Sequence, residues 1–176
     1  MTLMNKHLLV VDDNSVNIEL LLDLLDDHGF DNVHGLSDPR HVLAYCQQQL
    51  PDLILLDIRM PHIDGYAVME QLQEHFADQT PPVIVLTAQI DDDTRHRALK
   101  MGIRDFLTKP FKHDEVLQRI RNTLDVEHRY QVRDKQAETL EQMVAKRTEE
   151  LDHQSRTDPI TQLPNRRALT QLLQEA

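Results

Sequence analysis

The chain has 176 residues, of which 40% are hydrophobic, so it can form one domain of ordinary size with an additional segment. It contains no Trp and few other aromatic residues, so aliphatic side chains must build the core. The formal net charge of −11 argues against a nucleic-acid groove, and the single cysteine, Cys46, excludes an internal disulfide. No apolar run approaches the roughly 20 residues of a bilayer span, and Asp12-Asp13 comes too early for a signal peptide, so we expect a cytoplasmic protein without membrane contact.

Five short apolar runs divide the first 110 residues, and each has the Val, Ile and Leu content of a buried parallel strand. They are residues 7–11, 32–36 (the weakest of the five), 53–56, 83–86 and 103–107. Amphipathic stretches of helical length lie between them, at 16–27, 39–49, 64–76 and 92–101. Strands that alternate with helices predict an α/β fold with a doubly wound, five-stranded parallel sheet.

Residues 113–156 contain no Gly or Pro, which predicts one long helix. Apolar residues along it recur at alternating spacings of four and three, at Val126, Tyr130, Ala137, Leu140, Val144 and Leu151. Arg133 and Arg147 occupy two further positions of this heptad seam and weaken it. A helix of about 65 Å, at 1.5 Å per residue, cannot bury its stripe on one small domain. The pattern therefore favours a parallel dimeric coiled coil, with a single solvent-exposed helix as the alternative.

Polar residues stand where the predicted strands end, and these ends meet at one rim of a parallel sheet. They are Asp12-Asp13, Asp57, Thr87 and Lys109. Three carboxylates in one pocket repel each other, and a hard cation such as Mg²⁺ relieves the repulsion. A carboxylate is also a nucleophile toward phosphorus, while a hydroxyl and an ammonium can neutralise phosphoryl oxygens. The pattern predicts magnesium-assisted formation of an aspartyl phosphate.

Each of these residues also has an ordinary structural interpretation. Asp12-Asp13 could be a solvated turn, Thr87 a helix cap and Lys109 a surface charge, and only their convergence favours a site. The ten His residues are interpreted as solvated, because no two lie three or four apart. The acidic run 91–93 is interpreted as a helix N-terminus.

Four runs, LLVVDDN, LILLDIRMPHIDGY, VIVLTA and DFLTKPF, together resemble the receiver domains of bacterial response regulators, from residue 6 to about 122. The resemblance implies a flavodoxin-like fold, with Asp57 as the phosphoacceptor and a sensor histidine kinase or phosphotransfer protein as the donor. It implies Mg²⁺ binding by Asp12, Asp13, Asp57 and the backbone carbonyl of Arg59, with Thr87 and Lys109 on the phosphoryl group.

The same resemblance implies a conformational switch. Phe106 matches the aromatic residue that turns inward when Thr87 moves toward the phosphoryl group, although plain core packing also explains an aromatic residue there. The Lys109–Pro110 peptide bond is expected to be cis. A phosphatase with an Asp nucleophile is the enzyme alternative; Arg59 stands where the haloacid-dehalogenase group has a second Asp, so we expect only slow self-dephosphorylation.

The run TDPITQLPNRRAL resembles the opening of a GGDEF domain, the diguanylate cyclase module, with Gln162 where Gly is usual. We therefore divide the chain into a receiver (1–122), a coiled-coil linker (123–156) and a truncated GGDEF start (157–176). The expected function is a two-component response regulator whose dimer would control cyclic di-GMP synthesis in a longer protein, while this chain itself is not an enzyme. A stand-alone receiver adaptor, whose coiled coil binds a partner, is the alternative.

Overall fold

The computed structural model describes residues 5–88, 96 and 100–156, with side chains up to residue 151. The chain divides into two compact units, residues 1–128 and 129–176. Most of the helix predicted at 92–101 and the whole segment 157–176 lie outside the described residues.

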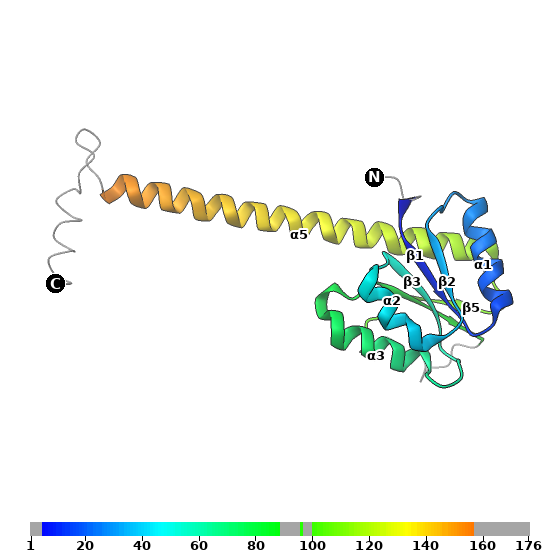
Figure 1. Ribbon diagram of the computed structural model, residues 1–176. Coiled ribbons are helices and arrows are strands. Elements are labelled where there is room, and N and C mark those ends of the chain that lie inside the picture. The colour runs from blue at the N-terminus through cyan, green and yellow to red at the C-terminus, as the bar shows by residue number, and fades with distance from the viewer. Residues whose placement is uncertain (1–4, 89–95, 97–99, 157–176) are drawn as a thin grey trace. The chain divides into compact units, whose positions relative to one another are not determined.

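A five-stranded parallel sheet forms the centre of the first unit (Figure 1). Its strands are β1 (Leu8–Val11), β2 (Val33–Leu36), β3 (Leu53–Asp57), β4 (Val83–Thr87) and β5 (Asp105–Thr108). Their order across the sheet is β2-β1-β3-β4-β5. The predicted fold class is therefore confirmed, with β5 beginning two residues later than the apolar run suggests.

Four described helices accompany the sheet, with two single-turn 3₁₀ segments at Pro39–His41 and Ala77–Gln79. They are α1 (Ser15–Asp27), α2 (Val42–Gln48), α3 (Gly65–Phe76) and α5 (His113–Arg156). The Asn14 side chain accepts a hydrogen bond from the N–H of Val16 and starts α1; Asp64 does the same for Ala67 and starts α3. These caps satisfy donors that the first helical turn leaves unpaired.

Two apolar clusters lie on opposite faces of the sheet, because successive strand residues point to opposite sides. One cluster joins Leu8, Val10 and Leu55 to buried residues of α1 and of the first part of α5. The other joins Leu9 and Leu56 to buried residues of α2 and α3. The residues of β1, β3 and β4 are buried on both faces, which explains their continuous apolar runs, whereas the edge strands β2 and β5 are only partly buried.

Helix α5 has 44 residues, so the long C-terminal helix is confirmed. Its first part packs on the sheet through Val116, Ile120 and Leu124. From residue 128 to 151 every side chain is exposed. Within the described part of the chain, no helix has both the length and the apolar content needed to cross a bilayer.

Candidate functional site

The polar residues singled out in the sequence lie together at the carboxyl ends of four strands. Asp12 follows β1, Asp57 is the last residue of β3, and Thr87 is the last residue of β4. The N–H of Lys109 donates to the carbonyl oxygen of Thr87 at 2.8 Å, which places Lys109 just beyond β5 at the same edge. The parallel register brings these ends together because all five strands run in one direction.

Carboxylate oxygens of Asp12, Asp13 and Asp57 lie within 4.8 Å of one another. Asp12 is fully buried, Asp57 is 4% exposed, and Asp13 faces solvent. Buried carboxylates are costly unless a positive charge or several donors compensate them. The site is therefore a concentrated negative charge with one side open to solvent.

Lys109 supplies a positive charge inside this cluster. Its Nζ donates to Asp12 Oδ2 at 2.6 Å and to Asp57 Oδ2 at 2.7 Å. Burial by itself would lower the pKa of Lys109, but the hydrogen bonds to Asp12 and Asp57 outweigh it, so the pKa is raised above its ordinary value. A raised lysine pKa means that this stabilisation is fully present at neutral pH and is lost only as the pH rises through the folded-state value.

Backbone and amide donors hold the two buried carboxylates in place. The N–H of Arg59 donates to Asp57 Oδ1 at 3.1 Å, while the Arg59 side chain is exposed. The N–H of Asn14 donates to Asp12 Oδ1 at 2.9 Å. Asn17 Nδ2 contacts both oxygens of Asp12, at 3.2 and 3.0 Å. The sequence reasoning missed Asn14 and Asn17, which follow Asp12 by two and five residues at the start of α1.

Thr87 and Phe106 belong to neighbouring strands. Thr87 is 3% exposed at the end of β4, and Phe106 on β5 pairs in register with Val85. The Phe106 side chain is half-buried and packs against the cluster under α2 and α3. The Lys109–Pro110 bond is cis, as the resemblance implies. The switch role of Thr87 and Phe106 stays a prediction.

Gly65 also supports the site, through its backbone. Its N–H donates to the carbonyl oxygen of Ile58 at 2.9 Å, which brings the start of α3 against the backbone that carries Asp57. A Cβ at position 65 would lie 2.9 Å from Ile58 Cα and 3.1 Å from the Asp57 carbonyl carbon. Glycine is required here because the neighbouring atoms are backbone and cannot turn aside.

We expect Gly65→Ala to lower the free energy of unfolding by about 2 kcal/mol, because overpacking against backbone costs that much. It should also weaken Mg²⁺ binding, because Asp57 must shift. Gly102→Ala is the matched control: φ of Gly102 is +71°, so alanine is strained there, but among the described residues its Cβ would meet just the flexible end of the Gln73 side chain, at 3.8 Å. Urea unfolding followed by circular dichroism and Mg²⁺ titration calorimetry measure both effects. Equal Mg²⁺ affinity in the two variants would contradict the role assigned to Gly65.

The donor set fits a hard divalent cation. Its side-chain ligands are all carboxylate oxygens, which Mg²⁺ prefers, and one of them, Asp13, is open to solvent. Among the described residues, Lys109 alone pairs with this cluster of three carboxylates, so negative charge remains for a cation to neutralise. The residues are thus suited to hold Mg²⁺ through Asp12, Asp13 and Asp57.

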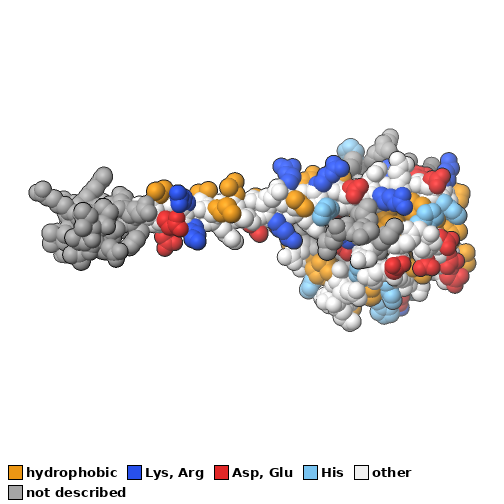
Figure 2. Space-filling view, turned by 90° about the horizontal axis from the view of Figure 1, so that it is seen from above, with side chains coloured by type: hydrophobic (Ala, Val, Ile, Leu, Met, Phe, Trp, Pro, Cys, Tyr) orange, Lys and Arg blue, Asp and Glu red, His pale blue; other side chains and the backbone are white. Residues whose placement is uncertain are grey.

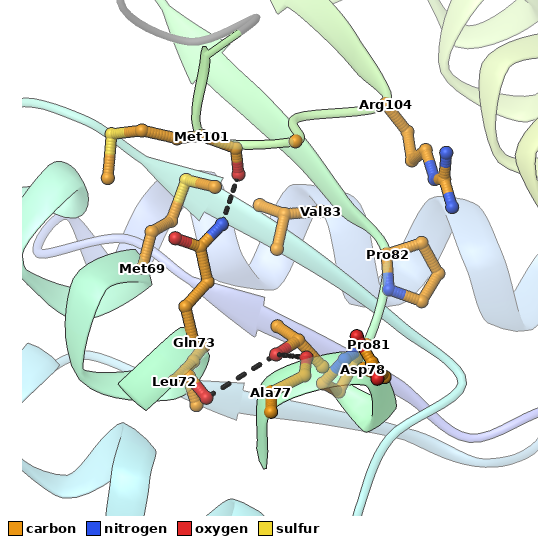
Figure 3. Close-up of a pocket in the computed structure, with 12 residues that line it drawn as sticks. Met69, Leu72, Gln73, Ala77, Asp78, Pro81, Pro82, Val83, Met101 and Arg104 are labelled. Carbon is orange, nitrogen blue, oxygen red and sulfur yellow. Dashed lines mark hydrogen bonds between the residues drawn. The ribbon is translucent and has the colours of Figure 1, made fainter. Parts of the chain in front are cut away.

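A separate hollow of about 350 Å³ lies at the other end of β4 (Figure 3). It is bordered by α3, by the 3₁₀ turn after α3 and by the segment that precedes β5. The side-chain amide of Gln73 reaches across it and donates to the carbonyl oxygen of Met101. Val83 begins β4 here, whereas Thr87 ends it at the acidic rim, so this hollow is distinct from the candidate site.

Comparison with known proteins places this geometry in a family. The model of the response regulator receiver domain matches residues 8–121. The alkaline phosphatase synthesis transcriptional regulatory protein PhoP of Bacillus subtilis is 36% identical over 121 residues, which are 69% of this chain and 49% of PhoP. The response regulator PleD of Caulobacter vibrioides is 34% identical over 119 residues, 68% of this chain and 26% of PleD. The cyclic di-GMP phosphodiesterase response regulator RpfG of Xanthomonas campestris is 29% identical over 151 residues, 85% of this chain and 40% of RpfG.

The chain spans about half the length of PhoP and less of the other two. A solved structure, the receiver domain of sensor histidine kinase PA1611 from Pseudomonas aeruginosa, is 29% identical, with a TM-score of 0.62. The match covers 69% of this chain and 98% of the PA1611 receiver domain. That domain holds a magnesium ion in its active-site cleft. Because the family model matches more than half of the chain, on a parallel sheet with an acidic rim, the protein belongs to the response regulator receiver domain family of two-component signalling proteins.

Proposed function

We propose that this receiver accepts a phosphoryl group on Asp57 from a sensor histidine kinase or a phosphotransfer protein. One observation carries the proposal: the Lys109 ammonium bridges Asp12 and Asp57 inside a cluster of three carboxylates at the carboxyl rim of the sheet. An anionic nucleophile, a fixed cation and a set of metal-ligating oxygens are the groups that phosphoryl transfer to a carboxylate requires.

In the proposed transfer, a carboxylate oxygen of Asp57 attacks the phosphorus of a phosphohistidine. A P–O bond forms as the P–N bond breaks, and the electron pair of the broken bond returns to the donor's imidazole nitrogen. Lys109 Nζ and the Thr87 hydroxyl donate hydrogen bonds to the phosphoryl oxygens. Mg²⁺ held by Asp12, Asp13, Asp57 and the Arg59 carbonyl would supply further charge neutralisation on those oxygens. Thr87 then moves toward the phosphoryl group, and Phe106 turns inward.

Asp57→Asn should abolish covalent phosphorylation, because an amide is not a nucleophile toward phosphorus. Asp52→Asn is the matched control: Asp52 forms a 2.7 Å ion pair with Lys6 just before β3, at the opposite edge of the sheet. Intact-protein mass spectrometry after incubation with acetyl phosphate and MgCl₂ detects the added phosphoryl group. We expect labelling of the parent and of Asp52→Asn only. A labelled Asp57→Asn would assign the phosphoacceptor to another residue.

We further infer that two copies pair in parallel through α5. The supporting feature is a set of apolar side chains at heptad spacing in a part of the helix where neighbouring residues are charged (Figure 2). Leu140 is 63% exposed, and Val144 and Leu151 are each 57% exposed. Water-exposed apolar stripes of this length need a covering partner, and a second α5 supplies the same pattern.

For the output, we propose that residues 157–176 begin a GGDEF domain and that the intact protein makes cyclic di-GMP. The relatives carry different outputs, since PhoP is a transcriptional regulator and RpfG a cyclic di-GMP phosphodiesterase, so the receiver alone does not decide this. The proposal rests on the sequence run after Thr157. Conversion of GTP to cyclic di-GMP by the intact protein tests it; an intact protein that lacks this activity and acts only by binding a partner would favour the stand-alone adaptor.

A further inference from the structure

We propose that Asn17 is a positioning residue for Asp12: its amide fixes the orientation of this buried carboxylate and thereby sets the affinity of the rim for Mg²⁺. The proposal deepens, and rests on, the proposed function of the same rim. In the described part of the chain, the Asn17 side chain donates to Asp12 and not to Asp57, so its action would be exerted through Asp12.

The contacts of Asp12 carry the argument. Each of its oxygens accepts two hydrogen bonds, and they come from separate parts of the chain. Oδ1 accepts from the Asn14 N–H at 2.9 Å and from Asn17 Nδ2 at 3.2 Å. Oδ2 accepts from Asn17 Nδ2 at 3.0 Å and from Lys109 Nζ at 2.6 Å. Asn17 is therefore the group that contacts both oxygens, and it holds the plane of the carboxylate.

Asn17 and Lys109 differ in what they do to the charge of Asp12. The ammonium of Lys109 offsets the negative charge, whereas the neutral amide of Asn17 orients the carboxylate and leaves that charge for a cation. Asp12 is fully buried, so water cannot replace a lost donor at low cost. Removing the amide would leave Lys109 as the stronger remaining partner and draw the carboxylate toward it, away from the position that the cation needs.

The position of Asn17 on α1 also separates this role from ordinary helix capping. Asn14 is the N-cap, so Asn17 lies at the third helical position, where a side chain can reach back to the N–H of the cap residue. Here the Asn14 N–H is already bonded to Asp12 Oδ1, and the Asn17 amide also points to Asp12. The side chain thus serves the rim, while the helix start is completed by the Asn14 side chain and the N–H of Val16.

Asn17→Leu tests the proposal, because it keeps the branched shape at Cγ and removes both donors. We expect its Mg²⁺ dissociation constant to rise by roughly 10-fold or more, the usual effect of removing a group that orients a metal ligand. Val16→Ala is the matched control in the same helical turn, since the Val16 side chain is 64% exposed. Titration calorimetry with MgCl₂ measures the affinity without any phosphorylation, and circular dichroism verifies that each variant is folded.

A second readout separates positioning from damage to the fold. Labelling of Asp57 by acetyl phosphate should be slow in Asn17→Leu at low Mg²⁺ and should recover to near the parental rate when Mg²⁺ is saturating. Asn17→Ala, which also lacks the donors, should behave in the same way. Equal Mg²⁺ affinity in Asn17→Leu and the parent overturns the proposal, as does a rate that stays low at saturating Mg²⁺. If the parent binds Mg²⁺ but is never labelled, the proposed function fails while the affinity comparison still tests Asn17.

Discussion

Lys109→Met should lower the free energy of unfolding by about 3 kcal/mol without divalent cation, and yet tighten Mg²⁺ binding by about 10-fold. The loss of stability follows from the two buried ion pairs at 2.6 and 2.7 Å, because removing one partner of a buried pair leaves uncompensated charge. The gain in affinity follows from the same change, since the ammonium and the cation compete for the same carboxylates.

The same substitution should slow labelling of Asp57 at least about 10²-fold at saturating Mg²⁺. The transferred phosphoryl group carries charge that Lys109 stabilises in the proposed mechanism, and removing one such donor typically costs this much. Tighter metal binding together with slower transfer is a pattern that general damage to the fold does not produce, because damage would weaken both.

Lys6→Met is the matched control for both measurements. Lys6 Nζ lies 2.7 Å from Asp52 Oδ1, an ion pair of equal length at the opposite edge of the sheet. Because the chain has no Trp, urea unfolding is best followed by far-UV circular dichroism at a fixed protein concentration. Titration calorimetry gives the Mg²⁺ affinity. Weaker or unchanged Mg²⁺ binding in Lys109→Met would show that the ammonium and the cation do not share one pocket.

The main elements of this rim were predictable because parallel strands are buried on both faces. Their continuous apolar runs mark where each strand ends, and the next polar residue must then lie at the carboxyl edge. Asp12 and Asp57 follow from this rule, whereas Lys109 lies one residue beyond the partly buried β5 and was predicted from its place after the last strand. The structure joins the three through hydrogen bonds from Lys109 Nζ to both carboxylates.

The supporting residues were harder to predict, because their roles depend on contacts between elements. In the sequence, Gly65 stands near the start of a predicted helix. The reason that no side chain fits at position 65 is seen only in the approach of α3 to the Asp57 backbone. In the sequence, Asn17 looks like an ordinary polar residue of an amphipathic helix. Its hydrogen bonds to Asp12 depend on the direction in which the chain passes from β1 into α1. Such close approaches have no periodic signature in the sequence.

The seam on α5 yields the other large expected effect, which concerns association. In a parallel coiled coil, Leu140 of each copy would be buried against its counterpart. Arg133 and Arg147 would place charges at two other positions of the seam and so destabilise the dimer. Leu140→Arg should weaken the dimer roughly 10³-fold, because burial of each Leu contributes about 2 kcal/mol and two copies are lost. Arg133→Leu should tighten the dimer by removing a charge from the same seam.

Gln142→Arg is the control, since position 142 faces away from the predicted seam and receives the same new charge. Light scattering over a range of concentrations measures the mass of each variant, with and without beryllofluoride and Mg²⁺ as a substitute for the phosphoryl group. The parent and Gln142→Arg should be dimeric where Leu140→Arg is monomeric, and beryllofluoride should change the mass or shape of the parent but not of Asp57→Asn. If Leu140→Arg and Gln142→Arg have equal dimer affinity, the apolar residues at heptad spacing do not form the interface, and α5 is either a single exposed helix or is covered by another partner.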